Sequence, residues 1–156
     1  MSESDVAERT WTFPWVKLRA YWMMIKDLQT GLLVVTGLAG YMSGRPEATW
    51  RSLLVLLGSL FLTVGGSTVL NMVIDRDIDG QMARTCGRPL PAGAVTVGEG
   101  RVLGLSMVFL GMLWAGVQAP LYGVVIFAGL FFDVVVYTLW LKRRSSWAIF
   151  WGGIAG

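Results

Sequence analysis

The chain has 156 residues, of which 54% are hydrophobic and only 15% are charged, and its mean hydropathy is +0.60. A soluble domain of this length would carry more charge and much shorter apolar runs, so the composition indicates an integral membrane protein. The net charge of +3 does not indicate nucleic-acid binding, because the basic residues lie between apolar runs and form no stripe interleaved with aromatic residues. The chain has no histidine and one cysteine, Cys86, which excludes His- or Cys-based metal sites, His-dependent nucleophilic catalysis and an intramolecular disulfide.

The apolar runs predict an all-α fold, a polytopic transmembrane helical bundle with about four full spans and the start of a fifth. Residues 1–21 form a polar, partly basic lead-in that lacks the apolar core of a secretory signal, and residues 22–156 form the transmembrane domain. We expect the full spans at Trp22–Tyr41, Trp50–Ile74, Val102–Gln118 and Leu121–Leu141. A last apolar segment opens at Trp147 and is shorter than the roughly 20 residues that cross a bilayer.

Basic residues are distributed unevenly around these spans. Of the 13 Lys and Arg residues, all but Arg45 and Arg51 lie in or beside the lead-in, in the polar connection at residues 75–101, or directly after the fourth span. The positive-inside rule therefore places the N-terminus and these three segments on the cytoplasmic side of the inner membrane. Three charged segments meet on one membrane face, which is where we expect the functional site.

The end of the second span carries oxygen-bearing side chains at steps of four residues, Asn71, Asp75 and Asp79. On an α-helix each step of four turns about 40° and rises about 6 Å, so the three groups line one stripe. Such a stripe suits Mg²⁺, which takes oxygen ligands from one or two carboxylates and completes its shell with water and substrate phosphates. The alternative is a solvated helix end, although acidic residues there oppose the helix dipole.

Several basic residues near this stripe are candidate partners of a diphosphate. Arg84 and Arg88 follow it within a few turns, and guanidinium groups bind phosphate oxygens well. Lys142 and Arg143 end the fourth span, where they either serve only as membrane-face cations or bind the diphosphate. Lys26, in the first span, either snorkels to the interface or contacts the diphosphate.

The fourth span contains an ionisable residue, Asp133, with Tyr137 one turn later. A charge inside a span is costly and marks a functional site by default, so we expect both residues to line the site. The alternatives for Asp133 are a structural hydrogen-bond partner or a protonated, neutral acid.

A competing motif begins at Asp79, where DGQMAR matches the opening DGxxAR of the CDP-alcohol phosphotransferases. That family also requires an aspartate three residues before the DG pair and a later GxxxDxxxD. Position 76 is arginine here, and no aspartate follows Gly93 until Asp133. The match therefore fails at its metal ligands.

NxxxDxxxD followed by RTxxRPLPAG resembles the first aspartate-rich motif of the UbiA superfamily of intramembrane prenyltransferases. IDRDIDGQMART and the later YTLWLKRRSSWAIFWGGIAG are most similar to the protoheme IX farnesyltransferase (haem O synthase) branch. The resemblance covers most of the chain from about Tyr21. It departs at Asp27-Leu28, where the family usually has Pro-Arg, and at Ala148, where it often has Asn.

The resemblance implies an enzyme with a central cavity that uses Mg²⁺ to ionise an allylic diphosphate and transfers the farnesyl group to an acceptor. Asn71, Asp75 and Asp79 would hold Mg²⁺. The leaving group would be neutralised by Arg84, Arg88, Lys142 and Arg143, and Lys26 matches the family's lysine in the first span. The acceptor would be haem b, giving haem O, with an aromatic quinone precursor as the alternative.

Family members have about nine spans and a second aspartate-rich motif. The chain is therefore expected to be a partial sequence, a truncated product, or one of two subunits whose partner supplies the second half. A non-catalytic membrane subunit or remnant is the alternative from a different functional class.

Overall fold

The computed structural model describes residues 14–25, 27–44, 47–142 and 144. Most residues in these ranges are helical, and no strand occurs within them, so the all-α prediction is confirmed. The elements in chain order are α2 (Pro14–Met24), α3 (Asp27–Gly44), α4 (Trp50–Ile74), the short α5 (Arg76–Asp79), α6 (Val97–Gln118), α7 (Pro120–Phe131) and the π-helix η1 (Phe132–Leu141).

Three helical stretches in the described part of the chain are long and apolar enough to cross a membrane. They are α4, α6 and the continuous α7–η1 stretch, which correspond to the second, third and fourth expected spans. The bounds of α4 match the prediction, whereas α6 begins at Val97 rather than Val102. The helix α3 does not qualify, because its 18 residues include Asp27 and Gln29. The segment expected to open at Trp147 lies outside the described residues.

The expected first span is not one helix, because the chain breaks between α2 and α3. A break leaves carbonyl groups without helical donors, which is costly in an apolar environment unless side chains supply the hydrogen bonds. Two buried threonines do so here. The hydroxyl of Thr68, in α4, lies 3.0 Å from the Ile25 carbonyl and that of Thr30 lies 2.6 Å from it. The predicted start of this span at Trp22 is therefore wrong, and the break is held against α4.

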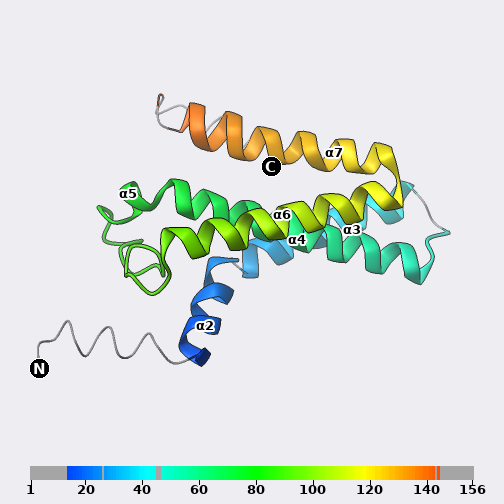
Figure 1. The fold of residues 1–156 in the computed structure, drawn as a ribbon. Coiled ribbons are helices and arrows are strands. Elements are labelled where there is room, and N and C mark those ends of the chain that lie inside the picture. The colour runs from blue at the N-terminus through cyan, green and yellow to red at the C-terminus, as the bar shows by residue number, and fades with distance from the viewer. Residues whose placement is uncertain (1–13, 26, 45–46, 143, 145–156) are drawn as a thin grey trace, which may run out of the picture.

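The helix α4 is the centre of the fold. It packs most extensively against α6, and α3, α7 and η1 also contact it. Figure 1 shows α4 and α6 side by side, with α7 and η1 along one side of the pair and α2 leaving on the other. Buried residues of α2, α4 and α6 form one apolar cluster around Met24 and Val69. The polar end of α4 is thus held by neighbours on several sides.

The polar connection after α4 is packed rather than disordered. Its residues Leu90, Ala94 and Val95 are at most 4% exposed and belong to the same apolar cluster. Gly93 has φ = 75°, a left-handed conformation that glycine adopts without steric cost. The loop therefore has a defined path, which is a requirement for its arginines to act at a fixed place.

The early start of α6 results from a capping box. Thr96 accepts a hydrogen bond from the backbone N–H of Glu99, and Glu99 accepts one from the backbone N–H of Thr96. Lys17 of α2 also donates to Glu99, with the Nζ atom 2.7 Å from Oε1. This end of α6 is consequently joined to both the loop and α2.

We expect Thr96→Ala to lower the free energy of unfolding by about 1 kcal/mol, the usual cost of losing an N-cap side chain. Thr96→Ser retains the hydroxyl and should stay close to the wild type. Thermal unfolding of the purified chain in detergent, followed by circular dichroism, measures both. Equal destabilisation by alanine and serine would show that the hydroxyl does not cap α6.

Candidate functional site

The predicted oxygen stripe lies at the end of α4, where the helical hydrogen bonds continue past the last regular turn. The Asp75 N–H donates to the Asn71 carbonyl at 2.9 Å, and the Asp79 N–H donates to the Asp75 carbonyl at 2.8 Å. Asp75 and Asp79 are each only 5% exposed. This burial argues against the alternative of a solvated helix end, because carboxylates are almost never buried unless they are paired.

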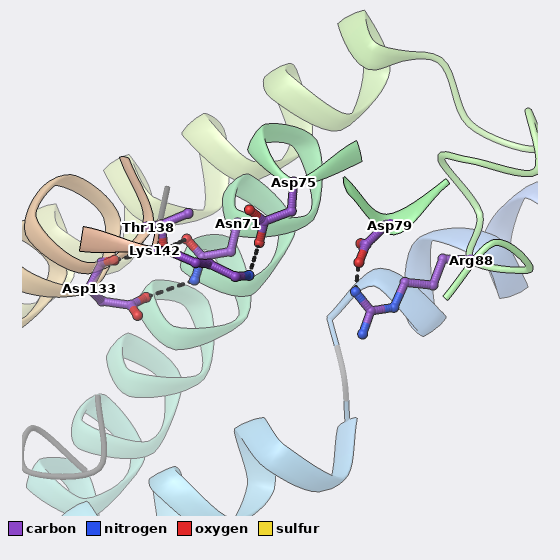
Figure 2. A network of polar contacts seen from close by, with 7 residues as sticks. All are labelled: Asn71, Asp75, Asp79, Arg88, Asp133, Thr138 and Lys142. Atoms are coloured by element: carbon purple, nitrogen blue, oxygen red, sulfur yellow. Dashed lines mark hydrogen bonds and ion pairs between the residues drawn. The ribbon is translucent and has the colours of Figure 1, made fainter. Parts of the chain in front are cut away.

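Each buried carboxylate is paired with a cation from a distant part of the chain. Lys142, at the end of η1, donates to Oδ2 of Asp75. Arg88, in the connection, donates to Oδ2 of Asp79 with a separation of 2.6 Å. Figure 2 shows the two pairs, with Lys142 on the η1 side of Asp75 and Arg88 on the other side of the turn, beside Asp79. Two of the predicted phosphate-binding cations therefore converge on the predicted metal ligands.

Of the other predicted cations, the structure describes Arg84. Arg84 is exposed and makes no ion pair with any residue in the described part of the chain. Lys26 and Arg143 lie outside the described residues. Their roles stay predictions.

Asn71 is joined to η1 through both ends of its side-chain amide. Its Nδ2 donates to Oδ2 of Asp133 at 3.1 Å, and its Oδ1 accepts a hydrogen bond from the Thr138 hydroxyl at 2.9 Å. The same Asp133 oxygen accepts a hydrogen bond from the Ser67 hydroxyl at 3.0 Å. The carboxylate inside the fourth span is thus a hydrogen-bond partner of the stripe, as one of the alternatives predicts (Figure 2).

A cavity of about 690 Å³ opens beside this network, between α3, α4, α7 and η1. Asp133 and Tyr137 both line it, together with Asn71. Its polar lining comes from Gln29 of α3, from Thr63, Ser67, Thr68 and Asn71 of α4, and from Asp133 and Tyr137 of η1, whereas Leu33, Val125, Ile126, Leu130 and Phe132 are apolar. A cavity with both polar and apolar lining suits an amphiphilic ligand with a charged head group.

Residues 32–156 match the sequence model of the UbiA prenyltransferase family. The chain belongs to this family. It is 41% identical over 140 residues to a protoheme IX farnesyltransferase of Archaeoglobus fulgidus, covering 90% of this chain and 50% of the relative. For a protoheme IX farnesyltransferase of Renibacterium salmoninarum the identity is 42% over 145 residues, covering 90% and 45%. The chain spans about half the length of these relatives. No solved structure matches it.

Membership of the UbiA family confirms the resemblance and argues against the CDP-alcohol phosphotransferase alternative. The three membrane-spanning stretches agree with a family of intramembrane enzymes, and the chain is an integral membrane protein. The matched range begins within α3 and includes α4, the connection and η1. All of the site's hydrogen bonds and ion pairs described above lie within that range.

The donor set of the stripe fits a magnesium ion. Oδ1 of Asp75 is buried and has no hydrogen-bond partner in the described part of the chain, which leaves one carboxylate oxygen available as a ligand. Asn71 and Asp79 add further oxygen atoms on neighbouring turns. The described residues contain no cluster of three or more His, Cys, Asp or Glu side chains. One free carboxylate oxygen is compatible with Mg²⁺, which can be held by one or two carboxylates together with water and substrate phosphates.

Sequence reasoning missed two residues of the network, Ser67 and Thr138. Ser67 lies four residues before Asn71, so the stripe continues into the apolar span by one more step of the same period. That spacing was a usable signal. Thr138 lies five residues after Asp133, a spacing that does not place two side chains on one face of an α-helix. A search for α-helical periodicity would therefore not have found it.

Proposed function

We propose that this chain supplies the metal- and diphosphate-binding site of an Mg²⁺-dependent prenyltransferase. The enzyme transfers a farnesyl group from an allylic diphosphate to haem b, giving haem O. The observation that carries the proposal is the convergence of Lys142 and Arg88 on Asp75 and Asp79, in a chain about 40% identical to protoheme IX farnesyltransferases. The remaining spans would come from a partner chain or from further sequence of the same protein.

The residues at the end of α4 have complementary roles in this reaction. Asp75 and Asp79, with Asn71, would hold Mg²⁺, which supplies electrostatic stabilisation of the departing diphosphate. Lys142 and Arg88 add positive charge where negative charge develops on the leaving group. Because ion pairs with Asp75 and Asp79 already hold both cations in the site, their long side chains need not reorganise when the substrate binds.

The cavity would accommodate the isoprenoid chain. Its apolar wall, formed in part by Leu33, Val125 and Phe132, can bury a prenyl group and exclude the water that would quench a carbocation. Asp133 and Tyr137 lie where the chain would meet its diphosphate end. We place this end on the cytoplasmic side of the inner membrane, from the Lys and Arg distribution.

The test offers labelled farnesyl diphosphate and Mg²⁺ to membranes that contain the chain, with haem b, a hydroxybenzoate or a CDP-activated lipid as the second substrate. We expect label to appear in haem b, and to disappear when EDTA removes the metal. Label in the hydroxybenzoate instead would indicate a quinone-precursor prenyltransferase. Absence of label with every acceptor in Mg²⁺, in membranes that also contain the partner chain or further sequence supplying the remaining spans, would favour the non-catalytic subunit or remnant.

A further inference from the structure

The amide of Asn71 is held in one orientation. Its nitrogen faces a carboxylate oxygen of Asp133 at 3.1 Å, and its oxygen faces the Thr138 hydroxyl at 2.9 Å. Rotating the amide by half a turn would place its carbonyl oxygen against the Asp133 carboxylate, which cannot donate when it is ionised. Thr138 is only 1% exposed, so water does not readily replace its hydroxyl.

The π-helical register of η1 is what presents these groups together. Asp133 and Lys142 are nine residues apart, and on an α-helix they would point about 180° apart. In η1 the hydrogen bonds skip one more residue. The Lys142 N–H donates to the Tyr137 carbonyl, and the Thr138 hydroxyl lies 2.9 Å from the Asp133 carbonyl. The wider turn, about 4.4 residues, returns Asp133, Thr138 and Lys142 to the same face.

That face is turned toward α4. Asp133 and Thr138 reach Asn71, and Lys142 reaches Asp75, one turn of α4 further on (Figure 2). With the Ser67–Asp133 hydrogen bond, four polar contacts along one seam align the two helices in register. A regular α-helix from Phe132 could not make the first and last of these contacts at once.

We propose that Thr138 is a positioning residue for the metal site. It acts through Asn71, whose amide oxygen it fixes one turn of α4 before Asp75, and the π-helical register of η1 is what brings it there. The inference rests on the proposed function, because it assumes that Asn71 is a ligand of Mg²⁺. Outer partners that orient a metal ligand typically change metal affinity by about 10–100-fold when removed. Thr138 is 1% exposed and its hydroxyl lies against Asn71 and the Asp133 carbonyl, so its effect on the site would be exerted through these neighbours.

The experiment compares Thr138→Val with Thr138→Ser in the purified full chain, using Mn²⁺ with inorganic pyrophosphate as the probe and electron paramagnetic resonance as the readout. Valine keeps the shape of threonine but loses the hydroxyl, and we expect it to weaken Mn²⁺ binding about tenfold or more. Serine restores the hydroxyl and should bind Mn²⁺ as the wild type does. Thr36→Val is the matched control, because Thr36 is exposed on α3 and, among the described residues, its side chain hydrogen-bonds only to the Leu32 carbonyl of its own helix.

Unchanged Mn²⁺ affinity in Thr138→Val would overturn the proposal, as would an equal loss in Thr138→Ser. If the valine variant fails to fold by circular dichroism, Asp133→Asn provides the second variant, and it too should weaken Mn²⁺ binding while its melting temperature stays near that of the wild type. Failure of the wild-type chain to bind Mn²⁺ would overturn the metal site itself and this proposal with it. That outcome is distinguishable from a selective failure of the variants.

Discussion

Replacing Asp75 with alanine is expected to weaken binding of Mn²⁺ with pyrophosphate at least about 100-fold and to abolish farnesyl transfer in membranes. Loss of an outer partner alone costs about 10–100-fold in metal affinity, so loss of a direct ligand should cost more. Asp75 is 5% exposed and has one oxygen without a partner among the described residues, which makes it the best-prepared ligand of the stripe. Titration with Mn²⁺ and the labelled farnesyl diphosphate assay measure the two effects.

The ion pair between Asp75 and Lys142 allows a second substitution, with a different expected effect on Mn²⁺ binding. Lys142→Met removes a cation but no metal ligand, so Mn²⁺ alone should bind at least as tightly as in the wild type, whereas pyrophosphate binding should weaken. The free energy of unfolding should fall more in Lys142→Met than in Asp75→Ala. Losing Lys142 leaves a buried carboxylate unpaired, at a cost of about 1–3 kcal/mol. Losing Asp75 leaves a lysine whose side chain is 38% exposed and can reach water.

Asp77→Asn is the matched control for the loss of a carboxylate. Asp77 lies in α5 between the two proposed ligands but is exposed. Its substitution should leave Mn²⁺ affinity within about twofold of the wild type, because a step of two residues turns a helix by about 200° and places this carboxylate on the side opposite the stripe. Equal losses in Asp75→Ala and Asp77→Asn would indicate that only the net charge of this turn matters, and would contradict a specific ligand role.

Much of this arrangement follows from patterns that the sequence displays directly. The apolar run at Trp50–Ile74 and the four-residue steps of the stripe have the helical period, and α4 forms as that period predicts. The early start of α6 was also readable, because Thr96 and Glu99 have the spacing of a capping box. The break after Ile25 could not be predicted from the sequence, because it depends on a hydrogen bond supplied by Thr68 of α4, a distant part of the chain.

The partners of the site were predictable as residue types but not as pairs. Lys142 and Arg88 were candidates for phosphate, yet their assignment to Asp75 and Asp79 depends on how the connection and η1 return to α4. The π-helical register of η1 is the feature that sequence patterns were least able to predict. Local periodicity tests for turns of about 3.6 residues, and a widened turn is stabilised here by contacts with Asn71 and Asp75 that lie more than 60 residues earlier in the chain.

The second large effect is expected at Gly66, where α4 and α6 are in close contact. A Cβ atom at this position would lie 2.8 Å from Cγ2 of Val108 and 2.9 Å from both the Gly104 carbonyl oxygen and the Val108 backbone nitrogen. A side chain can rotate away, but two of these three atoms belong to the backbone of α6. Gly66→Ala can therefore fit only if the helices separate, which we expect to cost about 1–3 kcal/mol.

This cost matters more in a membrane than in water, because helices there associate mainly through close packing of small residues. Denaturant titration of the purified chain in mixed micelles, followed by circular dichroism, measures the loss. The matched control is Gly116→Ala in α6, where an added Cβ meets no atom within 4 Å. That variant should be neutral or slightly more stable, since alanine has the higher helix propensity by up to about 1 kcal/mol. If Gly66→Ala were as stable as Gly116→Ala, the α4–α6 interface would be looser than the structure describes, and α4 would not be the fixed support that its three oxygen donors require.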